Sequence, residues 1–212
     1  MGTIRKGILG GFSGKVGSVV GSSWKGIAYM RSLPLKVRNP RTEPQRSQRS
    51  KFALSLSMLQ PMTAFLRTGW KLYANKQSAF NAAMSYTISN AIIGAYPDYE
   101  IDASKVLVSR GSLTTADNGS AIVARGDLVF SWNNNSGVNS AKETDKALIA
   151  VLNFDKGEAI TNNAGSERIA GTQTVTLPAD WLGDSVEAYL GFISEDGKEV
   201  SNSVYLGSVA LA

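Results

Sequence analysis

Several residue types on which enzymes and metal sites depend are missing from this 212-residue chain. It contains no cysteine and no histidine. Disulfide scaffolds, cysteine nucleophiles, histidine bases, haem ligation and zinc sites built from these residues are therefore excluded. We accordingly expect no cofactor, no bound metal and no enzymatic activity.

Long apolar runs are also missing. Near the start of the chain the apolar run is only Ile8-Leu9, which glycines interrupt and Lys15 follows. A secretion signal needs an apolar stretch of about 7–15 residues, and a membrane-spanning helix needs about 20. We expect synthesis in the cytoplasm and no membrane partner.

Charge is divided unevenly along the chain. Residues 1–76 hold 14 Lys or Arg and one acidic residue, Glu43, whereas residues 77–212 hold 8 basic and 16 acidic residues. The two segments therefore carry net charges of +13 and −8. Because opposite fields attract different partners, this division predicts two parts with different contacts, the first of which meets something negative.

The first third of the chain predicts a hairpin followed by helices. Lys25-Gly26 lies between two apolar segments, and its glycine tolerates the positive φ of a tight turn, so a β-hairpin is expected there after an extended arm. Residues 42–94 show helical spacing, with Pro61 ending or kinking the first helix. A later helix is expected from Ser78 to Ile93, capped by Gly94.

From Asp98 onward the apolar residues alternate, as in half-buried strands. The alternating sets are Leu128, Phe130 and Trp132; Leu148, Ala150, Leu152 and Phe154; Val186, Ala188, Leu190 and Phe192; Val204 and Leu206. With Val106–Val108 and Thr174–Leu177, they predict about seven strands, typical of an immunoglobulin-like or fibronectin-III-like sandwich.

The expected fold class is therefore α+β, with an N-terminal hairpin and short α-helices followed by an all-β sandwich. The expected domains are residues 1–97, which are basic, and residues 98–212, which are acidic.

Chemical motifs are incomplete. Gly14-Lys15 resembles the end of a phosphate-binding loop, but Leu9 occupies the first glycine position and Val16 replaces the Ser/Thr that binds magnesium. A glycosidase needs only two carboxylates, and calcium accepts irregular oxygen cages. The residues considered for these sites are Glu187, Glu195, Asp196 and Glu199 for the first, and Asp155, Asp180 and Asp184 for the second. We interpret them as exposed turn charges.

The strongest remaining signal is a basic cluster in residues 36–51. Its cations are Lys36, Arg38, Arg41, Arg46, Arg49 and Lys51. Three interpretations stay open: a surface for self-association with acidic sandwich domains, a non-specific nucleic-acid site, or a solvated face. Trp24, Tyr29 and Trp70 are candidate stacking residues for bases, although aromatics at such spacings are more often core residues.

Parts of the sequence resemble a known family. The segments are Gly2–Gly17, Val19–Gly26, Asn39–Glu43 with Gln48–Phe52, Phe80–Ala83 through Asn90–Ile92, and Val200–Leu206. They are similar to an uncharacterised domain-of-unknown-function family of Bacteroidota and their phages and prophages. The resemblance implies a bacterial or phage setting and no assigned activity.

Together these observations favour a non-enzymatic structural protein of a phage or phage-like particle, a homo-oligomer that meets other particle proteins through residues 1–97 and ends in the virion. The alternative is a nucleic-acid-packaging protein that uses the cations of residues 36–51. A third hypothesis is an adhesin or carbohydrate binder using the sandwich loops Asn133–Gly137 and Asn162–Gly165.

Overall fold

The computed structural model describes residues 2–4, 7, 10–24, 26–36, 39 and 41–211. The chain divides into two compact units, Met1–Thr42 and Glu43–Ala212. Each unit is described by itself.

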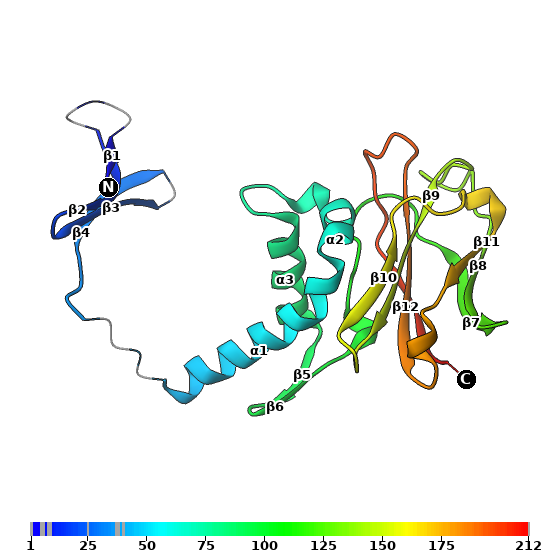
Figure 1. Cartoon of the computed structure of the whole chain (residues 1–212). Helices are drawn as coiled ribbons and strands as arrows, with labels where there is room; N and C mark the ends of the chain where they lie inside the picture. Colours follow the sequence, from blue (N-terminus) through cyan, green and yellow to red (C-terminus); the bar gives the residue numbers. More distant parts are fainter. Residues whose placement is uncertain are drawn as a thin grey trace. The chain divides into compact units, whose positions relative to one another are not determined.

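The first unit is an antiparallel sheet of four strands in the order β1-β2-β3-β4 (Figure 1). Its strands are β1 (Thr3–Ile4), β2 (Phe12–Val16), β3 (Val19–Trp24) and β4 (Ile27–Ser32). The expected hairpin is confirmed, since β3 and β4 pair across the turn at Gly26, whose φ is +86°. The segment expected to be an extended arm adds β1 and β2 to this hairpin.

The second unit begins with its helices. These are α1 (Glu43–Leu59), the 3-10 turn η1 (Gln60–Met62), α2 (Thr63–Gly69), η2 (Lys71–Tyr73) and α3 (Ala79–Asn90). Pro61 lies in η1, as its inability to continue a helix requires. Ser78 caps α3 by accepting a hydrogen bond from the backbone N–H of Asn81 at 3.1 Å. Among the described residues, no helix has the length and apolarity needed to cross a membrane.

The end of α3 differs from the expectation. The helix stops at Asn90, and the next residues form a two-stranded hairpin of β5 (Ile92–Ala95) and β6 (Asp98–Ile101). Gly94, expected as the helix cap, lies in β5 with φ of +83°. A Cβ atom there would lie 2.4 Å from the carbonyl oxygen of Asp98, so the close hairpin accounts for this glycine.

Two antiparallel sheets form the rest of the unit. One has the order β10-β9-β12-β13 and the other β11-β8-β7. The strands are β7 (Asp117–Ala124), β8 (Asp127–Asn133), β9 (Lys146–Asn153), β10 (Glu158–Asn162), β11 (Thr172–Thr176), β12 (Ser185–Ile193) and β13 (Val204–Ala210), with 3-10 turns η3 (Ala103–Lys105), η4 (Arg168–Ala170) and η5 (Ala179–Trp181). The fold class is thus mixed α+β with a mostly β portion.

The strands of the structure differ from the expected sandwich strands in two details. Val106–Val108 is not a strand; Val106 and Val108 are buried beneath the helices instead. The additional strand is β10, which pairs with β9. In constant-type immunoglobulin domains the fourth strand joins the sheet of the first, second and fifth strands, so β10 departs from that arrangement. The immunoglobulin-like or fibronectin-III-like assignment stays a prediction.

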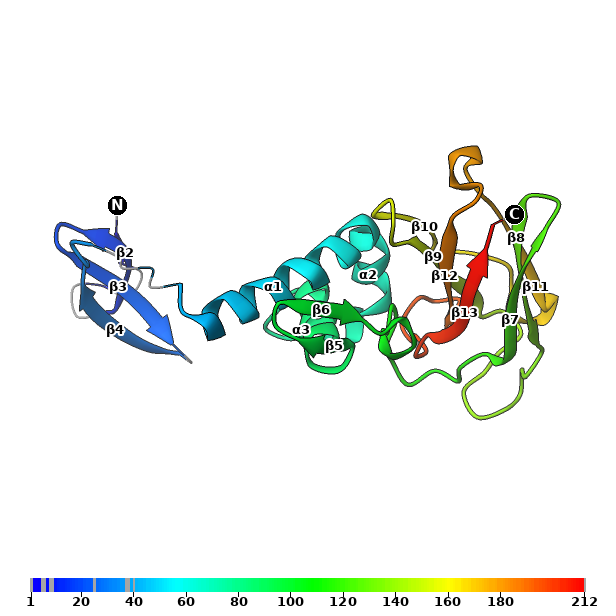
Figure 2. The same cartoon turned by 90° about the horizontal axis from the view of Figure 1, so that it is seen from below.

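The four-stranded sheet is the middle of three layers (Figures 1 and 2). In β9, Ala147, Ile149 and Val151 join the core shared with the second sheet, whereas the alternating partners Leu148, Ala150 and Leu152 join the core shared with the helices. The helices and the sandwich therefore share this sheet. This sharing explains why the helices and the sandwich belong to one compact unit, Glu43–Ala212. The expected division into residues 1–97 and 98–212 stays a prediction.

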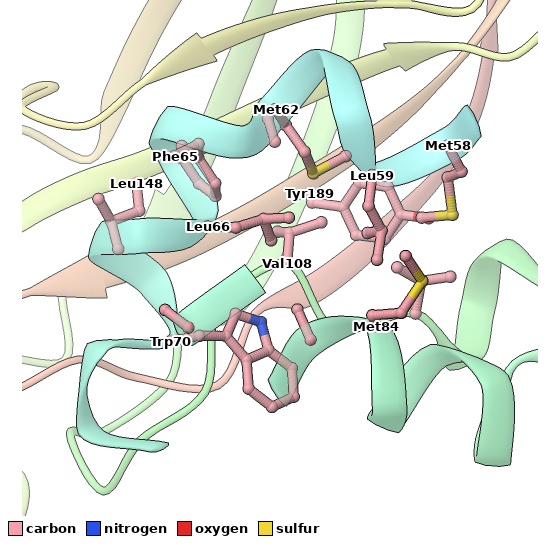
Figure 3. Close-up of a cluster of buried hydrophobic side chains, with 14 of the residues drawn as sticks. Met58, Leu59, Met62, Phe65, Leu66, Trp70, Met84, Val108, Leu148 and Tyr189 are labelled. Atoms are coloured by element: carbon pink, nitrogen blue, oxygen red, sulfur yellow. The ribbon is translucent and has the colours of Figure 1, made fainter. Parts of the chain in front are cut away.

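Figure 3 shows the core on the helical face. Leu59, Phe65 and Leu66 from the helices lie against Leu148 and Tyr189 from the sheet, and all five side chains are fully buried. At roughly 1.5–3 kcal/mol for each large apolar side chain buried, this cluster is a major source of stability for the unit.

Candidate functional site

The basic cluster of residues 36–51 is divided between the two units. Lys36 and Arg41 belong to the first unit, where both are exposed. Arg46, Arg49 and Lys51 lie in the N-terminal half of α1 in the second unit. Arg38 lies outside the described residues. The structure thus assigns these cations to two separate bodies.

The α1 cations have different surroundings. Arg46 and Arg49 are exposed. Lys51 lies against the β5–β6 hairpin, with its Nζ 4.8 Å from the centroid of the Tyr99 ring. Ser47 supports the same contact, because its Oγ is 2.7 Å from the Tyr99 hydroxyl. Lys51 therefore helps to hold α1 on β6.

Of the three candidate stacking residues, one is buried and two are exposed. Trp70 is a core residue, 1% exposed, and its indole N–H donates to the carbonyl oxygen of Leu107 at 3.2 Å. Trp24 and Tyr29 are 65% and 44% exposed in the sheet of the first unit. Trp70 is therefore removed from the set, and Trp24 and Tyr29 remain on the surface.

The first unit has little interior. None of its described residues is among the buried apolar side chains of the chain, which begin at Met58. On one face of the sheet the ring of Phe12 packs on Gly21. A Cβ atom on Gly21 would lie 2.5 Å from this ring. The strand register places Lys15, Val20 and Arg31 in one row across the sheet. Alternation then places Trp24, Ile27 and Tyr29 on the same face as that row.

This face, defined by Lys15, Trp24, Ile27, Tyr29 and Arg31, is called the basic aromatic face. Ile27 is 69% exposed. The unit as a whole contains eight Lys or Arg residues and no acidic residue. The basic aromatic face therefore combines exposed apolar side chains with positive charge. A partner surface complementary to it would be apolar and bordered by carboxylates.

The second unit contains a groove with that character. Two recesses of about 570 and 760 Å³ share Ser57, Pro61, Gly157 and Glu158, and together they lie between α1, η1, β6 and the β9–β10 hairpin. We call them the α1–β10 groove. Most of the lining is apolar, for example Leu54, Met58, Ile101, Phe154, Ile160 and Trp181.

All charged residues that line the α1–β10 groove are acidic. They are Glu100, Asp155 and Glu158. Glu158 is held in place by the indole N–H of Trp181, which donates to its Oε2 at 2.9 Å. The groove therefore presents negative charge around an apolar floor. Nothing in the sequence pattern marks it, because its residues come from six separate elements: α1, η1, β6, β9, β10 and η5.

Two of the three carboxylates considered for calcium, Asp180 and Asp184, contact a lysine of the same chain. The ammonium group of Lys156 is 3.2 Å from Asp184 and 3.4 Å from Asp180. The amide of Asn153 donates to Asp184 at 2.7 Å, and this hydrogen bond, with Lys156, lowers the pKa of Asp184. Across the residues that the structure describes, no three side chains are grouped as a metal site.

Two of the four carboxylates considered for a glycosidase pair, Asp196 and Glu187, make hydrogen bonds within the chain. Asp196 accepts from the Ser194 hydroxyl at 2.7 Å and from the backbone N–H of Lys198 at 3.0 Å, closing the turn before β13. Glu187 accepts a hydrogen bond from the Tyr205 hydroxyl at 2.5 Å. These contacts organise turns and strands.

The two sandwich loops proposed for glycans use their amides internally. In the first, Asn135 accepts from the Arg168 guanidinium at 2.6 Å and donates to the carbonyl oxygen of Thr115 at 3.0 Å. In the second, Asn162 accepts from the backbone N–H of Ala164 at 3.0 Å. These side chains shape the loops, and sugar binding by the loops stays a prediction.

A buried ion pair between the sheets gave no signal in the sequence. Arg168 and Asp145 are both fully buried, with Nε and Oδ2 3.1 Å apart. The guanidinium also donates to the carbonyl oxygen of Thr114 at 2.9 Å and lies 3.8 Å from the centroid of the Phe192 ring. Burial lowers the pKa of Arg168, an effect that Asp145 opposes. The pair fixes loops at one end of the sandwich.

These features define a mixed α+β protein in which a basic β-sheet unit accompanies a helix-covered antiparallel sandwich. The chain matches the family of unknown function DUF6266 over residues 11–207, and it belongs to that family. The expected membership of a domain-of-unknown-function family is therefore confirmed, whereas the bacterial or phage setting stays a prediction. No curated protein matches the chain.

Proposed function

We propose that this protein is a non-enzymatic structural subunit that self-associates through its N-terminal unit, residues 1–42, and displays its helix-covered sandwich. Its setting in this proposal is a phage or phage-like particle.

The observation that carries the proposal is that no described residue of the N-terminal unit is a buried apolar side chain. A unit as short as Met1–Thr42 buries only a small fraction of its apolar surface by itself, which makes its stability in water marginal. Its β4 strand is exposed along its whole length, with Ile27 at 69% and Met30 at 70%. Covering these side chains with a partner supplies the burial that the unit lacks.

Charge supports a second copy as that partner. The N-terminal unit carries +8, whereas residues 43–212, with 14 basic and 17 acidic residues, carry −3. Attraction between unlike units of neighbouring copies favours head-to-tail association over contact between identical basic surfaces.

The particle setting rests on analogy. Sandwich domains are common on the heads, tails and fibres of phages, and a fold alone does not define a function. The absence of any complete catalytic motif in the sequence is consistent with a structural role.

The test is the mass of the purified, nuclease-treated full chain in solution, measured by light scattering in about 0.1 M and about 1 M salt. Over that range the Debye length falls from about 10 Å to about 3 Å. We expect a multimer that shrinks at the higher salt concentration. The matched control is residues 43–212, which retain both hydrophobic cores. We expect this fragment to be monomeric at both salt concentrations. A full chain that is monomeric throughout contradicts the proposal.

A second function is favoured by one observation, the exposure of Arg46 and Arg49 on α1. We propose non-specific nucleic-acid binding as the alternative, in which phosphates contact these cations together with Lys36, Arg38 and Arg41. The logarithm of the affinity should then fall linearly with the logarithm of salt concentration. Unchanged DNA mobility at low salt would exclude it.

A further inference from the structure

We infer that β4 of one copy adds as a strand to the free edge of β10 in a second copy, so that the basic aromatic face enters the α1–β10 groove. This inference rests on the proposed function and names the surface that receives the N-terminal unit.

The first step is that β4 has a free edge. Among the described strands β4 pairs with β3 alone. The turn between Trp24 and Ile27 contains two residues, so Trp24 and Ile27 form a hydrogen-bonded pair. Along the hairpin, hydrogen-bonded pairs then alternate with pairs that are not hydrogen-bonded. The bond from the Leu33 N–H to the Ser18 carbonyl oxygen, at 2.7 Å, continues this register. The backbone groups of Ala28, Met30 and Ser32 therefore point away from β3.

The second step is that β10 also has a free edge. It pairs with β9, and no other described strand adjoins it. The larger recess of the groove runs beside β10, at Gly157–Ile160, and its far wall contains Pro178 and Trp181. The sheet's other edge strand, β13, lies beside β7. Strand addition to an exposed edge is a common mode of recognition, with backbone hydrogen bonds giving affinity and side-chain pockets giving specificity.

The third step is that the two strands match in size and chemistry. β4 has six residues and β10 has five. The basic aromatic face brings Lys15 and Arg31 beside apolar side chains, and the charged residues of the groove are Glu100, Asp155 and Glu158. An added β4 strand places its apolar side chains over the apolar floor and Arg31, the cation of β4, near these carboxylates. Lys15 lies two strands away, in β2.

The contact between β4 and the α1–β10 groove limits the symmetry of the assembly. The contact joins two different surfaces, so the copy that donates β4 keeps an unused groove and the copy that receives it keeps an unused β4. Such heterologous contacts produce rings when the rotation closes and open filaments when it does not.

Disulfide trapping tests the inference cleanly because the natural chain has no cysteine. One set of full-length variants carries a cysteine in β4, Tyr29→Cys or Met30→Cys, which are on opposite faces of the strand. The other set carries Glu158→Cys or Thr161→Cys, on opposite faces of β10. All four residues are exposed. A disulfide requires Cα atoms within about 7 Å, so only neighbouring strands are trapped.

We expect a band of doubled mass when a β4 variant is mixed with a β10 variant and oxidised, and no such band from either variant alone. The matched control replaces the β10 variant with Ser208→Cys, which is exposed on β13 at the opposite edge of the same sheet. It should give no cross-link with the β4 variants.

The other outcomes overturn the inference in distinguishable ways. Cross-linking of a β4 variant with itself would show pairing between two β4 strands. Cross-linking to Ser208→Cys would place the strand at the wrong edge. A multimer by light scattering with no cross-link in any mixture would refute the β10 site while leaving self-association intact. A natural chain that is monomeric at both salt concentrations would refute the proposed function as well.

Discussion

At the residue scale, Arg168 shows how a charge is tolerated inside the sandwich. Its guanidinium contacts Asp145, Asn135 and the carbonyl oxygen of Thr114, three points that are distant in sequence. Sequence patterns do not reveal such a pair, because an arginine and an aspartate separated by 23 residues look like ordinary surface charges. Burial is decided by the loops that surround them.

We predict that Arg168→Met lowers the free energy of unfolding by about 3–5 kcal/mol, because it leaves Asp145 buried without its cation. Urea unfolding measures the loss. The matched control is Lys198→Met, which removes an exposed pair with Asp196 and should cost at most about 1 kcal/mol. The milder variant Arg168→Lys keeps the positive charge. Its loss of unfolding free energy should lie between those of Arg168→Met and Lys198→Met. Equal, small losses for all three would contradict the prediction.

Tyr189 is the second residue whose environment has a measurable consequence. Its hydroxyl donates to the carbonyl oxygen of Ala103 at 2.8 Å, and its side chain is fully buried. Burial raises the pKa of Tyr189 well above its usual value of 10.0. Burial, with the hydrogen bond to Glu187, also raises the pKa of Tyr205, to about 12.

A raised pKa means that the folded state keeps the phenol neutral while the unfolded state ionises. The contribution to stability is therefore complete below about pH 10 and falls as pH rises above it. For Tyr189 we predict a loss of about 1.4 kcal/mol per pH unit above that point. Urea unfolding at about pH 8 and pH 11 should show a smaller pH effect in Tyr189→Phe than in the natural chain. Identical pH effects would refute this assignment.

At the element scale, much of the secondary structure was predictable. Caps, prolines and glycines marked the helices and the N-terminal hairpin, and alternation marked most strands. Two errors have physical reasons. Val106–Val108 is a short apolar run like that of a strand, but Val106 and Val108 are buried by the helices and pair with no described strand. Gly94 lies in a hairpin where a helix cap was expected. Propensity is local, whereas these outcomes depend on tertiary packing.

The sharing of one sheet by two cores makes a prediction about α2. Leu66→Ala should lower the free energy of unfolding by about 2–5 kcal/mol, because Leu66 is fully buried. Hydrogen exchange should show that protection falls by the same free energy in α2 and in β8, on the far side of the sheet. Leu72→Ala, at a side chain 48% exposed, is the control and should change little. Loss of protection confined to the helices would instead indicate a separate helical domain.

At the scale of the whole molecule, the division of charge was visible in the sequence, but the boundary between units was not. The run Ala147–Leu152 is apolar at every position, which is typical of a strand buried on both faces. Alternation alone selects Leu148, Ala150 and Leu152 and overlooks the residues between them. Read in full, the run indicates a second layer on the sheet, and the helices are that layer. The α1–β10 groove was not predictable, because it exists only where the helices meet the hairpin.

We predict that limited trypsin digestion cuts first between the two units. Residues 33–42 form no helix or strand where the structure describes them, and Lys36 and Arg41 are exposed. Mass spectrometry should identify a resistant fragment that begins near Thr42 and no longer associates. Replacing Lys36, Arg38 and Arg41 with Gln should slow this cut. An initial cut within the sandwich would contradict the prediction.

The doubly covered β9 strand also affects how this family can vary. In β7 and β11 roughly every second side chain faces away from the core, so those positions can change without loss of packing. β9 has seven consecutive buried residues from Ala147 to Asn153, and each is constrained by one neighbouring layer or the other. Relatives should therefore diverge with a two-residue rhythm along the outer strands and hardly at all along β9. Insertions, labels and fusion points belong on the outer strands for the same reason.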